Sequence, residues 1–289
     1  WRLASAVSNN GGLGLLGAGS MHPEMLVEHI RKMKEATDKP WGINVPLLYP
    51  EIDRLMNIII QEGVKIVFTS AGSPKKWTPL LKSHGITVVH VISSALFAKK
   101  CEEAGVDAVV AEGFEAGGHN GREETTTLTL IPNVVESCSL PVIAAGGISS
   151  GKSVAAAMTL GAEGVQIGTR FAVAAESSAH PTFKQRVFDT EEGGTMLALK
   201  KLAPTRLIKN DFFNQVKALE DAGAEAAQLT ELLGKGRAKK GIEGDMTEGE
   251  LEIGQIASML HKEETVAEIM ENIIADFNKT TSKLGDLKL

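Results

Sequence analysis

One histidine of the chain lies in a loop that combines glycines with carboxylates. His119 belongs to the segment Ala111–Gly121, which directly follows the short apolar run Asp107–Val110. Glycines let a backbone approach a flat or charged ligand closely, and histidine exchanges a proton near neutral pH. The loop therefore indicates a binding site where His119 acts in proton transfer and Gly117 and Gly118 contact the ligand. A simple turn with a surface histidine is the alternative.

Two further glycine loops follow two consecutive predicted strands. The first contains Ala145, Gly146 and Gly147 ahead of a predicted helix, and the second contains Gly168 and Thr169. Backbone N–H groups in such loops bind anions, and the loops after the last strands of a parallel barrel commonly bind phosphate. We therefore expect a phosphate-bearing cofactor there, although a pair of tight turns would give the same pattern.

Polar side chains at other strand ends are placed to contact the rest of that cofactor. Asn44 lies inside an otherwise apolar strand, where its amide can hydrogen-bond a heteroaromatic edge or, alternatively, a neighbouring backbone group. Ser70 and Ala71 begin a segment small enough to admit a ring. Glu112 can accept a hydrogen bond from a ligand hydroxyl or pair with a basic side chain. His90 is expected in the core instead.

Composition and charge argue against several other classes of protein. The 289 residues carry a net charge of −6, which argues against a nucleic-acid-binding surface. No apolar stretch reaches membrane-spanning length and no signal peptide is visible, so we expect a cytoplasmic protein without membrane contact. Cys101 and Cys138 lack the spacing of a metal site or a disulfide framework, and no metal is expected. The glycines of residues 11–19 do not have the spacing of a dinucleotide-binding loop.

Short apolar segments alternate with longer amphipathic ones over residues 1–175, which is typical of a parallel sheet covered by helices. The predicted strands are Leu13–Gly17, Gly42–Leu47, Val64–Thr69, Thr87–Val91, Asp107–Ala111, Pro141–Ala145 and Gly164–Gly168. The predicted helices are Arg2–Asn9, Pro23–Ala36, Glu51–Glu62, Lys75–Ser83, Ser94–Glu103, Leu128–Ser137 and Gly151–Leu160. This pattern favours a TIM-type (β/α)8 barrel whose first strand is missing ahead of Trp1. An open doubly wound sheet is the alternative.

Residues 176–289 have a different pattern, with helices and no strong strand signal. The predicted helices are Phe212–Ala222, Ala224–Leu233, Glu250–Leu260 and Glu264–Asn278, separated by glycine-rich breaks. We expect a helical appendage that covers the barrel mouth, forms part of the substrate channel and returns to the barrel. The basic residues within 235–240 are interpreted as a solvated turn, or as a docking surface for an acidic carrier protein.

Three segments resemble the nitronate monooxygenase superfamily, a group of FMN-dependent barrels that includes the flavin-type enoyl-acyl carrier protein reductase II. They are Glu115–Gly121 (EAGGHNG), Pro141–Ile148 (PVIAAGGI) and Gly161–Phe171 (GAEGVQIGTRF). Residues 176–181 and 254–265 are more similar to the enoyl reductase branch. The resemblance covers essentially the whole chain.

The resemblance implies that the protein binds FMN. The implied phosphate contacts are Gly146, Gly147, Gly168 and Thr169. Asn44 and Gln166 would lie near the flavin ring or its ribityl chain, and His119 would lie over the reactive face of the flavin. An N-terminal Gly-Gly-Met motif that contacts the flavin in the family does not occur in this chain.

Three functions are compatible with these residues. An enoyl-acyl carrier protein reductase would use NADH or NADPH to reduce the flavin, pass a hydride to the β-carbon of an enoyl thioester, and protonate the α-carbon from His119 or water. A nitronate monooxygenase would use His119 as a base and oxygen as the electron acceptor. A non-catalytic barrel that binds a phosphorylated ligand is the third possibility. The family resemblance also suggests a homodimer.

Overall fold

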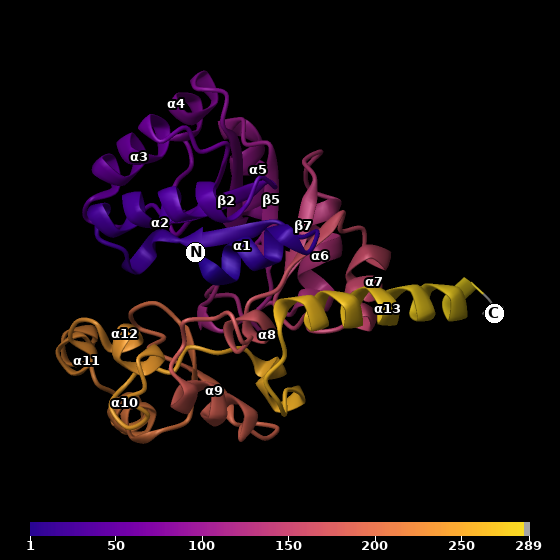
Figure 1. The fold of residues 1–289 in the computed structure, drawn as a ribbon. Coiled ribbons are helices and arrows are strands. Elements are labelled where there is room, and N and C mark those ends of the chain that lie inside the picture. The colour runs from indigo at the N-terminus through magenta and orange to yellow at the C-terminus, as the bar shows by residue number, and fades with distance from the viewer. Residues whose placement is uncertain (286–289) are drawn as a thin grey trace.

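Seven parallel strands form one sheet in the part of the chain that the structure describes, residues 1–285 of this computed structural model. The sheet curls, and helices cover its outer face (Figure 1). The strands, in their order across the sheet, are β1 (Gly14–Gly17), β2 (Trp41–Pro46), β3 (Ile66–Ser70), β4 (Thr87–Ile92), β5 (Ala108–Glu112), β7 (Val142–Ala145) and β8 (Gly164–Gln166). Each coincides with a predicted strand, which confirms the TIM-type barrel architecture.

Both faces of the sheet are buried because each strand alternates between two apolar layers. On the outer face, Ile43 and Val45 of β2 are 0% exposed and pack in the large core under the helices. On the inner face, Phe68, Val89 and Val110 pack together inside the curl. Successive side chains of a strand point to opposite faces, so this alternation determines which polar residues face the interior.

The helices that cover the sheet begin and end close to their predicted bounds. They are α1 (Arg2–Asn9), α2 (Pro23–Ala36), α3 (Ile52–Gln61), α4 (Thr78–Ser83), α5 (Ala95–Ala104), α6 (Thr127–Val135) and α7 (Gly151–Thr159). Local caps explain two of the starts. The Ser94 side chain accepts a hydrogen bond from the Phe97 N–H at α5, and Ser150 and Ser153 form a capping box at α7.

The second part of the chain contains a sheet that the sequence pattern did not predict. Strands β9 (Thr195–Ala198) and β10 (Thr205–Ile208) are antiparallel, and β10 also pairs with the short strand β6 (Gly118–His119). The expectation of a helical region without strands is therefore wrong. Strands of four residues are too short for a clear alternation signal, and the partner strand β6 lies in the loop after β5, which no local pattern reveals.

The predicted helix Glu250–Leu260 is wrong in its first half. Residues 250–254 are not helical, and they form an isolated bridge to β10. Only Gln255–Met259 is helical, and it forms the short 3₁₀ helix η2. A Cβ on Gly254 would lie 2.8 Å from Thr169 Oγ1. The glycine therefore allows this segment to run close to the barrel, where a helix could not.

The remaining helices lie between β8 and the C-terminus. They are α8 (Thr169–Ala172), α9 (Pro181–Phe188), α10 (Asp211–Asp221), α11 (Ala226–Leu233), α12 (Arg237–Ile242) and α13 (Val266–Gly285). The last helix, α13, packs along α7 and α1 (Figure 1). Asp276 of α13 accepts a hydrogen bond from the Lys152 N–H at the start of α7, at 2.9 Å. None of the described helices is long and apolar enough to cross a membrane.

Candidate functional site

Four polar side chains at the carboxyl ends of the strands face the interior of the curled sheet. Asn44 lies between Ile43 and Val45, which both face the outer helices. Ser70 and Glu112 each stand two residues after an inward-facing apolar side chain, and Gln166 follows the outward-facing Val165. The structure thus brings four predicted site residues to one end of the sheet, and we call them the strand-end ring: Asn44, Ser70, Glu112 and Gln166.

The amide of Asn44 is available to a ligand. Its Oδ1 atom is buried and accepts no hydrogen bond among the described residues. A buried polar atom without a partner costs about 1–3 kcal/mol, so native structures rarely leave one unpaired. A ring N–H or a ribityl hydroxyl would supply the missing donor. This orphaned oxygen is the first sign that the ring fits a polar, flat cofactor such as FMN.

The loop after β7 provides backbone donors at the same end of the barrel. Gly146 and Gly147 have φ of +90° and +70°, a conformation that favours glycine. No acceptor is present in the described chain for the N–H groups of Gly147 and Ile148. The Thr127 hydroxyl donates to the Gly146 carbonyl at 2.9 Å and so braces the loop. The free N–H groups fit a phosphate, which supports the sequence-based expectation.

The loop after β8 completes the predicted phosphate site. A Cβ on Gly168 would meet no atom within 4 Å, so this face of the loop is open. The Thr169 hydroxyl accepts a hydrogen bond from the Gly254 N–H at 2.9 Å and keeps its own proton for a ligand oxygen. The N-terminus of α7 itself is less available than predicted, because Ser153 Oγ accepts from the N–H groups of Ser149 and Ser150. The available donors therefore belong to the loops and not to the helix end.

Glu112 and His90 differ in how the protein uses them. Glu112 is half-buried, its carboxylate makes no hydrogen bond to a described residue, and burial raises its pKa to about 7. His90 is 4% exposed and lies 2.6 Å from the Thr69 hydroxyl, and burial lowers its pKa to about 4. His90 is therefore the core histidine that the sequence predicted.

Ala71, just after the ring residue Ser70, has φ of +51°, so the chain turns sharply there.

His119 lies outside the strand-end ring, on strand β6 of the second sheet. It pairs with Thr205 of β10, and its side chain is exposed. Together with Thr205, Arg237 and Glu250 it lines a small cavity of about 180 Å³. The structure therefore places the predicted proton-transfer residue in a second group of side chains, next to a carboxylate that the sequence analysis missed.

Two glutamates near His119, the buried Glu250 and the half-buried Glu252, were not predicted as site residues. Burial and the neighbouring Glu252 raise the pKa of Glu250 to about 7, against the influence of His119 and Arg237. Burial raises the pKa of Glu252 to about 6. Neither glutamate could be identified from local sequence, because both fell within a predicted helix and the bridge between Glu252 and β10 joins segments remote in sequence.

The segment with these glutamates joins the histidine loop to the phosphate loops. A Cβ on Gly117 would lie 2.4 Å from the Ile253 backbone, and one on Gly118 would lie 3.0 Å from the Glu252 carboxylate. The Gln255 N–H donates to the Glu115 carbonyl at 2.9 Å. Gly117 and Gly118 are therefore needed for close packing of the chain, and contact with a cofactor remains a prediction for them. Among the described residues, no group of three or more His, Cys, Asp or Glu side chains could hold a metal.

Comparison with known proteins agrees with this architecture. The family model described as nitronate monooxygenase matches residues 1–54 and 49–276. A probable nitronate monooxygenase of Bacillus subtilis is 31% identical over 94% of this chain and 90% of that protein. A (3aS,4S,5R,7aS)-5-hydroxy-7a-methyl-1-oxo-octahydro-1H-indene-4-carboxyl-CoA dehydrogenase of Rhodococcus jostii is 29% identical over 99% of this chain and 92% of that protein.

A solved structure extends the comparison to three dimensions. FabK from Thermotoga maritima superposes with a TM-score of 0.93 at 40% identity, and the match covers 98% of this chain and 90% of that one. The likeness includes both the barrel and the second part of the chain, since nearly all residues are covered. The chain therefore belongs to the nitronate monooxygenase family and is a flavin-dependent oxidoreductase.

Proposed function

We propose that this protein is an FMN-dependent enoyl-acyl carrier protein reductase that takes electrons from NADH or NADPH. The observation that carries the proposal is the likeness to FabK, at 40% identity over almost the whole chain. FabK represents the enoyl reductase branch to which the motifs of this chain are most similar. The substrate would be a trans-2-enoyl thioester of fatty acid synthesis.

The residues of the barrel end would hold the cofactor. The N–H groups of Gly147, Ile148 and Gly168 and the Thr169 hydroxyl would donate to the phosphate, because they lack acceptors or retain a free proton. Asn44 would pair its orphaned oxygen with a donor on the cofactor. FMN, when bound, supplies hydride transfer between the pyridine nucleotide and the β-carbon of the thioester.

His119 would supply the proton that the α-carbon requires. An exposed imidazole on a glycine-rich loop can reach a substrate, and histidine is a common general acid near neutral pH. The Glu250 carboxyl lines the same small cavity as His119, so it lies within reach of a substrate or water that contacts the imidazole. Thr205 holds the backbone of His119 in β6.

Nitronate monooxygenase is the second candidate, favoured by the family model and by the Bacillus subtilis relative. With a nitroalkane as substrate, a neutral His119 would remove a proton from the carbon beside the nitro group to form the nitronate, and oxygen would accept the electrons in its oxidation. The two candidates thus require opposite protonation states of the same imidazole.

The deciding experiment compares two assays on the FMN-loaded protein. NADH or NADPH oxidation is measured with crotonyl thioester, and oxygen consumption is measured with an alkyl nitronate. We expect thioester-dependent oxidation of the nucleotide that exceeds nitronate oxidation. Rapid nitronate oxidation together with no thioester-dependent turnover would contradict the proposal and favour the second candidate.

A further inference from the structure

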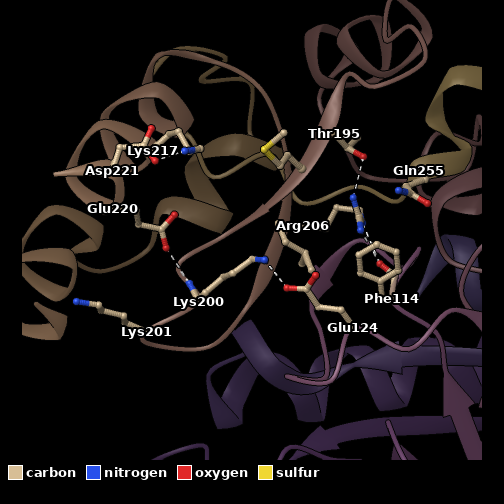
Figure 2. A pocket seen from close by; sticks show the side chains of 12 residues that line it. Phe114, Glu124, Thr195, Lys200, Lys201, Arg206, Lys217, Glu220, Asp221 and Gln255 are labelled. Carbon is tan, nitrogen blue, oxygen red and sulfur yellow. Dashed lines mark hydrogen bonds and ion pairs between the residues drawn. The ribbon is translucent and has the colours of Figure 1, made fainter. Parts of the chain in front are cut away.

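A larger cavity lies around the edge strand β9 of the second sheet, and β10 separates this strand from β6, which carries His119. It has a volume of about 600 Å³ and lies between β9, β10, α10 and the loops around Phe114 and Glu124 (Figure 2). In β10, Arg206 lines this cavity, while its neighbour Thr205 lines the small cavity of His119. Thr195, Met196 and Leu197 follow one another in β9 and all line the larger cavity, so this cavity extends around the edge of the sheet that lies away from β6.

Two of the four basic side chains in this cavity, Lys200 and Lys217, are held only by exposed ion pairs, with Glu124 and Asp221. Lys201 lies 3.2 Å from Glu225 and also donates to the Ala224 carbonyl at 2.7 Å. The side chains of Lys200 and Lys217 are 52% and 42% exposed. Exposed pairs of this kind contribute little, so Lys200 and Lys217 can turn toward another anion at small cost.

The fourth basic side chain, Arg206, is buried without a carboxylate partner. It is 2% exposed, and no carboxylate forms an ion pair with it in the described part of the chain. Its Nε and Nη2 donate to the Phe114 carbonyl at 3.1 and 2.7 Å, and Nη1 donates to Thr195 Oγ1 at 3.4 Å. A guanidinium has five N–H donors, so the Nη atoms can still donate to a further acceptor. Burial lowers the pKa of Arg206, and only the more distant charges of Glu115 and Glu124 oppose this effect, so a closer anion would stabilise the guanidinium further.

The position of the cavity connects it with the cofactor loops. Phe114 and Gln255 form part of its wall, and the Arg206 guanidinium lies 4.8 Å from the centre of the Phe114 ring (Figure 2). The residues next to them reach the phosphate loops: a Cβ on Gly146 would lie 2.6 Å from the Gly113 carbonyl, and the Gly254 N–H donates to Thr169. A ligand in this cavity would therefore contact Phe114 or Gln255, whose chain neighbours Gly113 and Gly254 contact the loops expected to hold FMN.

We propose that this cavity binds the phosphate ester of a co-substrate, with Arg206, Lys200 and Lys217 as its anion-binding side chains. Phosphate esters occur both in the adenosine part of NADH and NADPH and in coenzyme A or phosphopantetheine thioesters, and guanidinium groups bind them through paired N–H donors. The inference rests on the proposed function, which requires both kinds of molecule to reach the flavin.

The test measures ligand binding and not turnover. The FMN-loaded protein carrying both Lys200→Ala and Lys217→Ala is titrated calorimetrically with NADPH, NADH, coenzyme A and inorganic phosphate. Lys239→Ala is the matched control, because Lys239, like Lys217, is an exposed helical lysine with an acidic partner four residues away, but it does not line the cavity. We expect affinity for at least one phosphate ester to fall about tenfold in the double variant and to stay unchanged in the control.

The separate probes distinguish the two sources of the phosphate ester. A loss confined to NADPH and NADH assigns the cavity to the reductant, and a loss confined to coenzyme A assigns it to the thioester. Arg206→Met removes the buried charge but keeps an apolar side chain, and it should lower the affinity for the same ligand. This variant is compared with the wild-type protein only if its flavin content and melting temperature are unchanged. Unchanged affinities for every probe in the double variant overturn the inference. If binding weakens but the wild-type protein reduces no enoyl thioester, the proposed function fails and the cavity assignment stands.

Discussion

The strand-end ring and the His119 region are built by different kinds of contact. The ring comes from parallel strands that follow one another along the chain, and it leaves groups without partners, such as Asn44 Oδ1 and the loop N–H groups. His119 is held instead by antiparallel pairing with β10 and stands beside the buried Glu250. Under the proposed function, the barrel would bind the cofactor and the second sheet would position the group that transfers a proton. Substitutions in one region should then leave the function of the other intact.

The largest effect is expected from Gly147→Asp in the barrel. Any side chain at φ of +70° is strained, and an added carboxylate would repel a phosphate at this loop. We expect colourless protein with flavin-dependent turnover reduced by more than about 10³-fold, a loss of ~4 kcal/mol in binding. Flavin absorbance of the purified protein is the measurement. Gly193→Asp is the control, since Gly193 has φ of +74° but lies outside both parts of the site. A yellow Gly147→Asp protein would exclude this loop as the phosphate site.

His119→Ala should affect the function of the second sheet and leave that of the barrel unchanged. Turnover with enoyl thioester should fall by about 10²-fold or more, the usual effect of removing a general acid, while the FMN content stays the same. Rapid-mixing experiments separate the two half-reactions. Reduction of the flavin by NADH or NADPH should remain fast, and its reoxidation by thioester should slow. If His119→Ala also loses FMN, the proposed separation between cofactor binding and proton transfer is incorrect.

The two regions also differ in how far the sequence predicts them. The seven strands and the helices around them follow from local alternation of apolar segments, and the ring residues follow from their positions at strand ends. Asn44 and Glu112 could thus be placed together before the structure was known. Parallel strands in sequence order make this possible, because neighbours in the sheet are neighbours along the chain.

The second sheet could not be predicted in the same way. β6 is two residues long and pairs with β10 from a distant part of the chain. Neither strand has enough residues for a periodic signal. The segment with Glu250 and Glu252 contains apolar residues at a spacing compatible with a helix, but its contacts with β10 and with Thr169 favour an open conformation. Tertiary contacts outweighed local propensity there.

Glu250→Gln should have a smaller effect that separates the two candidate functions. The glutamine keeps the shape of the side chain and removes the charge beside His119. If His119 donates a proton to the thioester, removal of the neighbouring negative charge should lower turnover at pH 8 about fivefold, corresponding to about 1 kcal/mol of charge interaction. Oxidation of a nitroalkane, in which the imidazole would accept a proton, should not fall. Glu252→Gln is the control, since it removes the carboxylate that raises the pKa of Glu250 but keeps Glu250 itself. Unchanged thioester turnover at pH 8 in Glu250→Gln would mean that this carboxylate does not act on His119.

The smallest effect concerns the stability of the protein and compares one carboxylate from each region. Burial raises the pKa of Glu112, and burial with Glu252 raises that of Glu250, each from 4.5 to about 7. Between pH 4.5 and about pH 7, these two carboxyl groups stay largely protonated in the folded protein, whereas in the unfolded chain they have lost their protons. Raising the pH from about 4.5 to about 7 should therefore lower the free energy of unfolding, and the loss should be complete above about 7. With allowance for partial exposure, we expect about 1–2 kcal/mol from each group.

Cofactor loading should affect only one of these two contributions. Glu112 faces the interior of the barrel end, so bound FMN would shield it further from water and steepen its pH dependence. Glu250 lies in the second sheet region, where the cofactor adds no cover. Melting temperatures between pH 5 and pH 8 should show that Glu112→Gln flattens the profile of the FMN-loaded protein more than that of the apoprotein, while Glu250→Gln flattens both equally. An equal response of the two variants to FMN would mean that the cofactor covers both regions, and that the binding and proton-transfer sites form one continuous surface.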